Sequence, residues 1–227
     1  MCGRYQSVSS PATLVDHFGV AEVRTEPLRE RFNVAPSTDV YAIIDHDDVR
    51  ALGTLRWGFV PRWAKRVGGT GQPINARLET VATSRMFASS FARRRCLLPA
   101  DGFYEWRDRG EGRAKQPYHL ADPDGTPLAF AGIWTTWRDP ESDEVTHSTA
   151  IVTTEARGTM TEIHHRMPVI LPTTLWANWL TTSDDAPHLL DTVTALGPPR
   201  LTATPVTTRV NNVCNDGPEL LEPGEVD

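Results

Sequence analysis

Short apolar runs separated by turn residues dominate the sequence, and they favour a fold built mainly from antiparallel strands. The runs are rich in β-branched and aromatic residues, and most have the length of a strand. They lie at residues 40–45, 52–60, 96–106, 118–121, 128–137, 148–154 and 201–206. Residues 46–48 are the expected turn of the first hairpin, and the run 96–106 is expected to be interrupted at Pro99 and Gly102.

Three segments carry helix signals. Ser10 is a capping residue followed by proline at the first helical position, and Gly19 ends this first helix. A second helix is expected between Asn75 and Phe91, and a third at residues 173–180. The predicted fold class is therefore α+β, with mainly antiparallel strands and a few short helices.

The length of the chain predicts one domain. A chain of 227 residues with 39% hydrophobic residues can bury a single substantial core. We expect that domain to cover residues 1–215. Residues 216–227 contain five acidic and no basic residues, together with proline, so we expect a flexible acidic tail there.

The cysteines and the apolar runs indicate the cellular setting. Cys2, Cys96 and Cys214 lie far apart and show no paired zinc-ligand spacing. The N-terminus has no secretory apolar region, and no run approaches the roughly 20 residues that span a bilayer. The sequence thus predicts a cytoplasmic protein without a metal, a cofactor or a membrane anchor.

Cys2 becomes the N-terminal residue if Met1 is removed. Its α-amine and thiol would then lie on adjacent carbons, with ordinary pKa values of roughly 7.7–8.0 and about 8.5. Both groups could act as nucleophiles near neutral pH. The alternative is that Cys2 is a small buried residue beside a strand.

Basic residues are concentrated in one part of this acidic chain. The net charge is −6, but residues 50–95 contain ten basic residues and a single acid, Glu79. Trp57 and Trp63 lie within this segment, and such a mixture suits the stacking of unpaired bases and the neutralisation of phosphates. The alternatives are that the rings belong to the core and that the arginines at 93–95 solvate a helix end.

Two other segments carry groups suited to proton transfer. Glu105 lies between Tyr104 and Trp106, and apolar neighbours of this kind would raise its pKa. The alternative is an exposed residue on a strand edge. His164 and His165 are adjacent, and on a strand they would face opposite sides, so we expect one of them to be structural.

Several motifs occur together and in a fixed order. They are Met1–Arg4, Trp57–Trp63, Asn75–Thr80, Pro99–Trp106, Ile163–Pro168 and the late block Val210–Asn212. In this combination the chain resembles the SOS response-associated peptidase family, whose members process abasic sites in DNA. The resemblance runs from residue 2 to about Pro223, and any one of these motifs alone would be weak.

The resemblance implies a barrel-like core and a specific set of site residues. The family's reactive cysteine falls on Cys2, and its asparagine, glutamate and histidine fall on Asn75, Glu105 and His164. Its DNA-contacting residues fall on Arg4, Arg77 and Arg85, with the base-stacking wedge near Trp63. His165 occupies a variable position between the motif histidine and Arg166.

The resemblance also implies an activity. The expected substrate is single-stranded DNA that contains an abasic site, and the expected product is a covalent thiazolidine between Cys2 and the sugar aldehyde. A strand-cleaving lyase reaction and self-processing removal of Met1 by a thiol peptidase activity are further expectations. No cofactor, membrane or obligate protein partner is implied, and the protein is expected at the nucleoid when it is engaged on DNA.

Other classes of protein share part of this pattern. An N-terminal-nucleophile amidohydrolase would also begin with a processed cysteine, and a thiol peptidase could pair Cys2 with His164. A single-strand DNA-binding module would use the basic, tryptophan-bearing segment without any covalent product. Hydrolysis of glutamine, or DNA binding without an adduct, would distinguish these alternatives from cross-linking.

Overall fold

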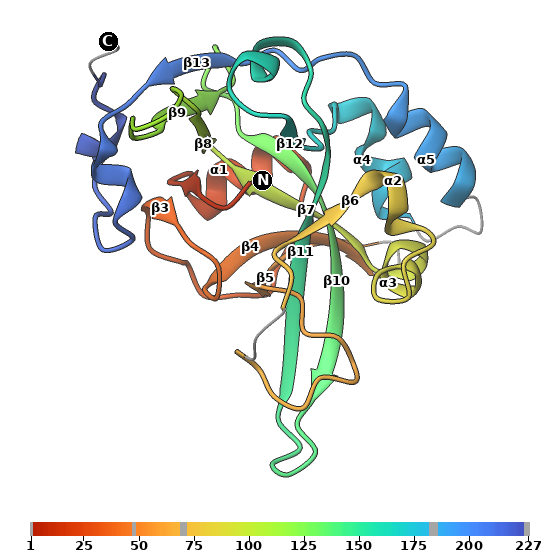
Figure 1. Ribbon diagram of the computed structural model, residues 1–227. Coiled ribbons are helices and arrows are strands. Elements are labelled where there is room, and N and C mark those ends of the chain that lie inside the picture. Colours follow the sequence, from red (N-terminus) through yellow and green to blue (C-terminus); the bar gives the residue numbers. More distant parts are fainter. Residues whose placement is uncertain (1, 47–48, 69–71, 182–185, 225–227) are drawn as a thin grey trace.

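Five strands of the protein close into a barrel. The computed structural model describes residues 2–46, 49–68, 72–181 and 186–224. The barrel strands pair antiparallel in the order β11, β10, β7, β4 and β5, and parallel pairing of β5 with β11 closes the ring (Figure 1). Their bounds are β4 Asp39–His46, β5 Val49–Trp57, β7 Arg95–Ala100, β10 Leu128–Arg138 and β11 Val145–Glu155. The expected α+β fold with a barrel-like core is confirmed.

A second sheet lies beside the barrel and carries two of the predicted site segments. Its strands follow the order β13, β9, β8, β1 and β3, and every pair is antiparallel. Their bounds are β1 Tyr5–Ser7, β3 Arg31–Val34, β8 Gly102–Arg107, β9 Gln116–Ala121 and β13 Thr202–Pro205. Cys2 lies three residues before the start of β1, and Glu105 lies on β8.

The run 96–106 forms two strands, and its break differs from the expected one. Pro99 lies inside β7 opposite Ala129, and the chain leaves the barrel at Asp101. The Asp101 carboxylate accepts hydrogen bonds from the backbone N–H groups of Val8 (2.6 Å) and Ser9 (2.9 Å). Asp101 therefore fixes the crossing from the barrel to the second sheet beside the end of β1.

The first predicted helix is confirmed, and the second is broken. Ser10 Oγ accepts from Thr13 N at 3.2 Å, and Gly19 ends α1 with a φ of 62°. The segment after Asn75 begins instead as a short strand that pairs with β11, and two separate short helices follow it. The apolar residues of this segment are only loosely periodic, and their spacing did not predict that the helix would be divided in two.

The helices and short elements cover the barrel and join its strands. The helices are α1 Pro11–Phe18, α2 Leu78–Val81, α3 Ala88–Arg93, α4 Thr173–Leu180 and α5 Ala186–Thr194. The short strands are β2 Glu22–Val23, β6 Asn75–Arg77 and β12 Arg166–Pro168, and the 3₁₀ turns are η1 Gly158–Glu162, η2 Thr208–Asn211 and η3 Pro218–Leu221. None of the helices in these ranges is both long and apolar enough to cross a membrane.

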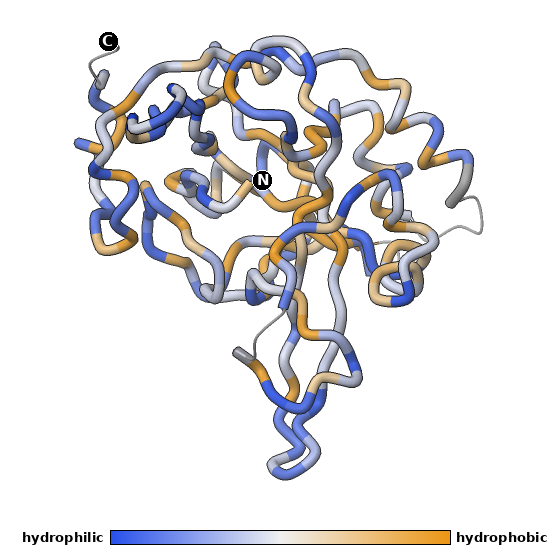
Figure 2. The backbone as a smooth tube through the Cα atoms, viewed as in Figure 1, coloured by the Kyte–Doolittle hydropathy of each residue, from blue (hydrophilic) through white to orange (hydrophobic). Residues whose placement is uncertain are grey.

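Two large apolar clusters fill the interior, and Figure 2 shows the hydrophobic residues gathered along the barrel strands. The first joins barrel residues to α1, α4 and α5, and the second contains Cys2, Tyr5 and Trp57. Trp57 is fully buried, so the core alternative holds for this ring, whereas Trp63 is 63% exposed. Cys2 is therefore part of a packed interior that also includes the end of β5.

Arg95 differs from its neighbours in the arginine triplet. It is only 2% exposed, and its guanidinium donates to the carbonyls of Phe91 (2.6 Å) and Trp179 (2.5 Å) and to that of Thr181. These carbonyls lie at the C-terminal ends of α3 and α4, where a positive charge is favourable. Arg95 thus stabilises two helix ends from inside the core, while Arg93 is exposed.

The C-terminal segment packs against the second sheet, so the expectation of a flexible tail is wrong as far as Gly224. Asp216 Oδ1 accepts from the backbone N–H groups of Phe32 (2.7 Å) and Asn33 (2.9 Å). Leu220 is fully buried, and Gly224 N donates to Pro205 O at 2.9 Å. The domain therefore includes this segment, and residues 225–227 lie outside the described part, as do turn residues 47 and 48.

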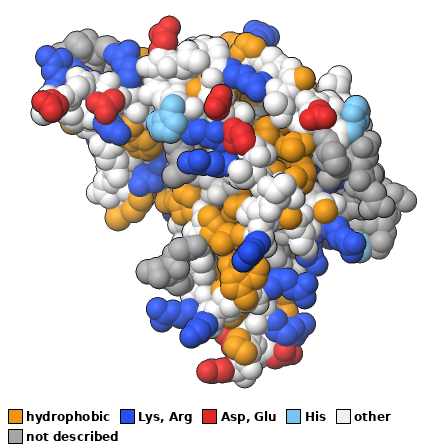
Figure 3. Space-filling model, turned by 45° about the vertical axis from the view of Figure 1, so that its right-hand side comes forward, with side chains coloured by type: hydrophobic (Ala, Val, Ile, Leu, Met, Phe, Trp, Pro, Cys, Tyr) orange, Lys and Arg blue, Asp and Glu red, His pale blue; other side chains and the backbone are white. Residues whose placement is uncertain are grey.

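The ends of β10 and β11 extend beyond the barrel as a hairpin arm, which we define as residues 135–147 (Figure 1). Trp137 Nε1 donates to Ala64 O at 2.8 Å and ties the arm to the loop that carries Trp63. Figure 3 shows hydrophobic surface flanked by Lys and Arg side chains on the part of the molecule that contains this arm. Trp63 in that loop and Val145 on the arm are both exposed.

The half-buried His119 makes the fold sensitive to acid. His119 lies opposite Tyr104 on the neighbouring strand, and its Nε2 is 2.9 Å from Gln6 Oε1. A Cβ on Gly102 would lie 2.2 Å from Nε2, so only glycine leaves room for this ring. Burial lowers the pKa of His119 to about 4, because the charged form loses its hydration.

We predict that stability falls between pH 6.5 and pH 4 because of His119. The unfolded chain takes up a proton near pH 6.5, whereas the folded chain does so only near pH 4. The free energy of unfolding should decrease by about 3 kcal/mol at most. Urea unfolding at pH 7 and pH 4.5 measures it, and His119→Gln should shrink the difference. The same substitution at the exposed His188 is the control, and equal pH dependence in all three proteins would contradict the assignment.

Candidate active site

Cys2 lies at the junction of the barrel and the second sheet. It is fully buried, and it packs in the apolar cluster that includes Tyr5, Trp57 and Ile163. Asn75 Nδ2 donates to the Cys2 carbonyl oxygen at 2.9 Å. Met1, whose removal would free the α-amine, lies outside the described residues.

Backbone pairing with β11 places Asn75. Residues 75–77 run parallel to β11, with Asn75 opposite Ile151, and Ile151 N donates to Ile74 O at 3.0 Å. Trp57 Nε1 donates to the same Ile74 oxygen at 3.0 Å. Asn75 Oδ1 is buried and has no hydrogen-bond partner among the described residues. The amide therefore holds the Cys2 backbone and offers an acceptor beside it.

Glu105 brings a buried carboxyl group to Cys2. It lies on β8, which pairs directly with β1, and it is 2% exposed. Burial raises the pKa of Glu105. Burial and then the negative charge of Glu105 raise the pKa of the Cys2 thiol. Tyr104 N donates to Arg4 O at 3.0 Å, so β8 runs beside the chain two residues after Cys2. The alternative of an exposed edge glutamate is thereby wrong.

His164 is held by the backbone of the strand that follows it. Arg166 N donates to His164 Nδ1 at 2.9 Å, and Arg166 O lies 3.1 Å from the same nitrogen. A neutral ring accepts the N–H bond and carries its proton on Nε2, whereas a charged ring can donate to the carbonyl. Burial lowers the pKa of His164, so the neutral ring is favoured near pH 7.

His165 does not face away from His164, which corrects the expectation based on strand alternation. Both residues lie in the turn between η1 and β12, and their rings stack with centroids 4.3 Å apart and planes at 29°. The pKa of His165 is lowered first by the charge of His164. No group of three or more metal-ligating side chains gathers at this site or elsewhere in the described ranges.

Arg166 anchors the histidine turn to the barrel. Its guanidinium donates to both carboxylate oxygens of Glu79, at 2.7 and 3.0 Å, and to Thr153 O at 2.7 Å. The arginine side chain is 8% exposed and that of Glu79 is 44% exposed. Sequence reasoning did not assign this pair a role, although both residues lie inside the quoted motifs.

A cavity of about 430 Å³ opens beside the histidines. It is lined by Arg77, Glu155, Ala156, Thr161, His164, His165 and Arg166. Arg77 therefore lies at the same opening as His164. Its backbone is placed by pairing with Thr153 of β11, so the strand that positions Asn75 also positions this arginine.

The other predicted DNA-contacting residues are distributed more widely. Arg85 is exposed in the turn between α2 and α3, and Trp63 is exposed beside the arm. Arg4 Nη1 donates to Asn33 Oδ1 at 3.2 Å and to Val210 O at 3.0 Å, and burial lowers the pKa of Arg4. Arg4 is thus engaged with the C-terminal segment.

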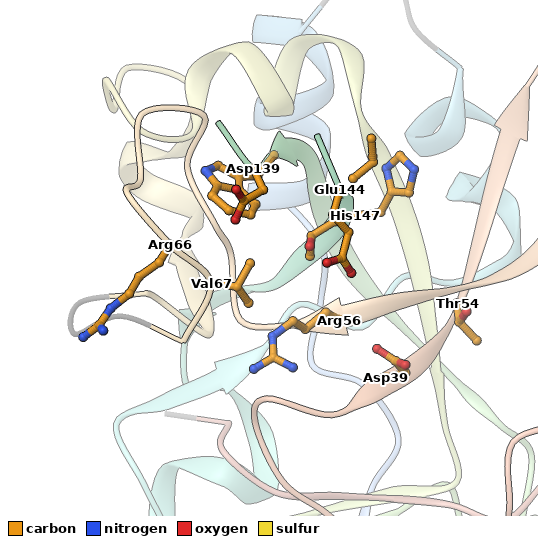
Figure 4. A pocket seen from close by; sticks show the side chains of 11 residues that line it. Asp39, Thr54, Arg56, Arg66, Val67, Asp139, Glu144 and His147 are labelled. Carbon is orange, nitrogen blue, oxygen red and sulfur yellow. The ribbon is translucent and has the colours of Figure 1, made fainter. Parts of the chain in front are cut away.

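A larger cavity, of about 610 Å³, lies at the base of the arm and contains none of the predicted site residues. Figure 4 shows Arg56 and Arg66 on its walls together with Asp39, Asp139 and Glu144. The residues that line this cavity carry charges of both signs. Of the predicted site residues, His164 and Arg77 line the smaller cavity, whereas Cys2, Asn75 and Glu105 are not among its lining residues.

The sequence of this chain matches a known family. A family model for SOS response associated peptidase (SRAP) covers residues 1–213, and the chain belongs to this family. It is 34% identical over 226 residues to the abasic site processing protein YoqW of Bacillus subtilis, with 98% of this chain and 99% of that protein aligned. It is 33% identical over 195 residues to the abasic site processing protein YedK of Escherichia coli, covering 85% and 84%.

A solved structure shares the fold. The crystal structure of a protein from Bacteroides thetaiotaomicron superimposes with a TM-score of 0.82 at 22% identity, over 99% of this chain and 100% of that one. At this identity the likeness concerns the fold alone. It supports the barrel and the second sheet as the fold of this chain.

The burial of Glu105 predicts a stability gain on neutralising it. Because the folded-state pKa of Glu105 is raised by burial, wild type loses stability as the pH rises above about 4.5 and through that pKa. Glu105→Gln should therefore become more stable relative to wild type as the pH increases from 4.5 to 8. Urea unfolding at both pH values measures this difference.

The matched control is Glu144→Gln, which makes the same change at an exposed position on the arm. This control should show little change between the two pH values. A Glu105→Gln protein whose stability relative to wild type falls as the pH rises would contradict the assignment.

Proposed function

We propose that this protein captures abasic sites in single-stranded DNA by forming a covalent thiazolidine between Cys2 and the ring-opened sugar. The main support is the hydrogen bond from Asn75 to the Cys2 carbonyl, together with the buried Glu105 on the strand that pairs with β1. Processing of abasic sites is the activity that the names of YoqW and YedK state for those proteins.

The reaction uses both groups of an N-terminal cysteine. After Met1 is removed, the α-amine adds to the aldehyde carbon, and loss of one water leaves an imine. The thiol sulfur then adds to the imine carbon, and its proton passes to the nitrogen. The product is a five-membered ring, and neither an oxidant nor a metal is consumed. Serine at position 2 cannot form this ring.

The raised pKa of the Cys2 thiol supports one order of these steps. Burial and the nearby Glu105 charge keep the group as a neutral thiol, which is a weak nucleophile. The amine therefore attacks first, and the thiol closes the ring on the more electrophilic imine. The same property disfavours the thiol peptidase and amidohydrolase alternatives, because both need a thiolate as the first nucleophile.

Glu105 and His164 are proposed to transfer protons. A carboxyl group with a raised pKa can give a proton to the departing water and take one from the thiol. His164 lies at the mouth of the cavity, where its Nε2 can exchange a proton with the sugar ring oxygen during ring opening. Elimination from the imine before the thiol adds would cleave the strand, which is the proposed lyase side reaction.

DNA is proposed to approach across the basic segment. Arg77 lies in the cavity wall and Arg85 is exposed nearby in sequence, so both can contact phosphates. The exposed Trp63 ring can stack on an unpaired base, which favours single strands. Arg4 is proposed to add a phosphate contact near Cys2 while its Nη1 stays bonded to Asn33 and Val210.

The test is to mix the protein with single-stranded DNA that carries one abasic site. We expect a species that survives denaturing gel electrophoresis, and none with the same DNA lacking the lesion. Cys2→Ala and Cys2→Ser should give no stable adduct, while Cys214→Ser, at an exposed cysteine, should react like wild type. Absence of the wild-type adduct, or an equal adduct with Cys2→Ala, would contradict the proposal.

The proton-transfer assignments predict slower cross-linking when either group is replaced. Glu105→Gln and His164→Gln should each lower the rate constant by at least about tenfold, because general acid–base catalysis commonly contributes 10²-fold or more. Single-turnover gels at saturating DNA measure this rate constant. His147→Gln on the arm is the control for the histidine. Wild-type rates in both site variants would remove these residues from the mechanism.

A further inference from the structure

A C-terminal strap, which we define as residues 206–224, packs against the sheet that carries Cys2 and Glu105. Its buried residues Val206, Val210 and Leu220 form an apolar cluster with Tyr104. In Figure 1 this segment runs beside β9 and β3. The family model ends at residue 213, so the second half of the strap lies beyond the matched region.

The strap contacts the two residues on either side of Glu105. Trp106 Nε1 donates to Asn211 Oδ1 at 2.7 Å, and Tyr104 lies in the strap's apolar cluster. Successive side chains on a strand point to opposite faces. Tyr104 and Trp106 therefore face the strap, and Glu105 faces the other side of β8, toward Cys2.

The strap also fixes the chain two residues after Cys2. The buried Asn33 donates from Nδ2 to the carbonyls of Val210 (3.2 Å), Asn212 (3.1 Å) and Asn215 (2.9 Å). Its Oδ1 accepts from Arg4 Nη1 at 3.2 Å. One buried amide thus joins the start of β1 to the strap, and Arg4 O accepts from Tyr104 N at 3.0 Å on the same edge.

Asp216 fastens the strap to β3. Its two carboxylate oxygens accept from the backbone N–H groups of Phe32 and Asn33, from Arg29 Nη2 at 3.1 Å and from Arg31 Nε at 3.3 Å. Tyr104 Oη donates to Phe32 O at 2.8 Å. The strap, β3, β1 and β8 are therefore linked behind the site by a continuous set of hydrogen bonds.

We infer that the strap residues Asn211 and Asp216, together with Asn33, are positioning residues that hold Glu105 and the Cys2 end of β1 in register for cross-linking. The inference rests on the proposed function. Imine formation and ring closure need the carboxyl, the amine and the thiol around one carbon atom. A small misplacement of the carboxyl group slows such a step without changing the surface that meets the DNA.

The most direct test is Asn211→Ala, because Asn211 is exposed and its loss removes the acceptor for Trp106 while the buried strap residues remain. At saturating abasic-site DNA the cross-linking rate constant should fall about threefold to tenfold. The DNA concentration at half-saturation and the thermal unfolding midpoint should stay at their wild-type values. Asn211→Asp keeps an acceptor oxygen and should restore the rate.

Cys214→Ser changes an exposed residue of the same strap and is the matched control. A wild-type rate in Asn211→Ala would overturn the inference, as would a loss that is explained by weaker DNA binding or lower stability.

Asp216→Asn keeps the oxygen facing Phe32 and Asn33 but loses the charge beside the arginines, and it should show the same slowing. If wild type forms no adduct, the proposed function fails as well, whereas an adduct with unaffected variants overturns the strap's role alone.

Discussion

The backbone pairing of β11 is the constraint on which the rest of the structure depends. This one strand pairs with β10, with β5 to close the barrel, with β6 and with β12. Pairing with β6 places Asn75 and Arg77, and pairing with β12 places the turn that holds His164 and His165. Residues that are far apart in sequence are therefore held next to the same strand.

The other half of the site comes from the second sheet, where β1 and β8 are neighbours. This pairing brings Cys2 and Glu105 together inside an apolar junction, and the burial that raises the pKa of both groups also costs folding stability. The fold offsets that cost with fully paired polar groups around the junction, such as Asp101, Asn33 and Asp216. Burial at this site lowers the folding stability, and it keeps the thiol neutral and makes the carboxyl group easier to protonate.

Much of the framework was predictable because local signals agreed with the final structure. Ser10, Pro11 and Gly19 set the limits of α1, and short apolar runs bounded by turn residues predicted most of the strands. Long-range pairing decided the rest: β6 is a strand because β11 accepts it, and the acidic segment after 215 packs because Asp216 meets the backbone of β3. Residue chemistry singled out Cys2 and Glu105, and the resemblance added Asn75, but the roles of Asn33 and Arg166 are visible only in the hydrogen bonds.

The central claim is that Cys2 reacts through both its amine and its thiol. It is tested most directly by intact mass and peptide mapping of the protein after reaction with an abasic-site oligonucleotide. The account predicts a mass equal to the protein without Met1 plus the DNA minus one water, with the attachment at Cys2 and no free thiol there. An adduct on another residue, or one that leaves the Cys2 thiol free for alkylation, would contradict it.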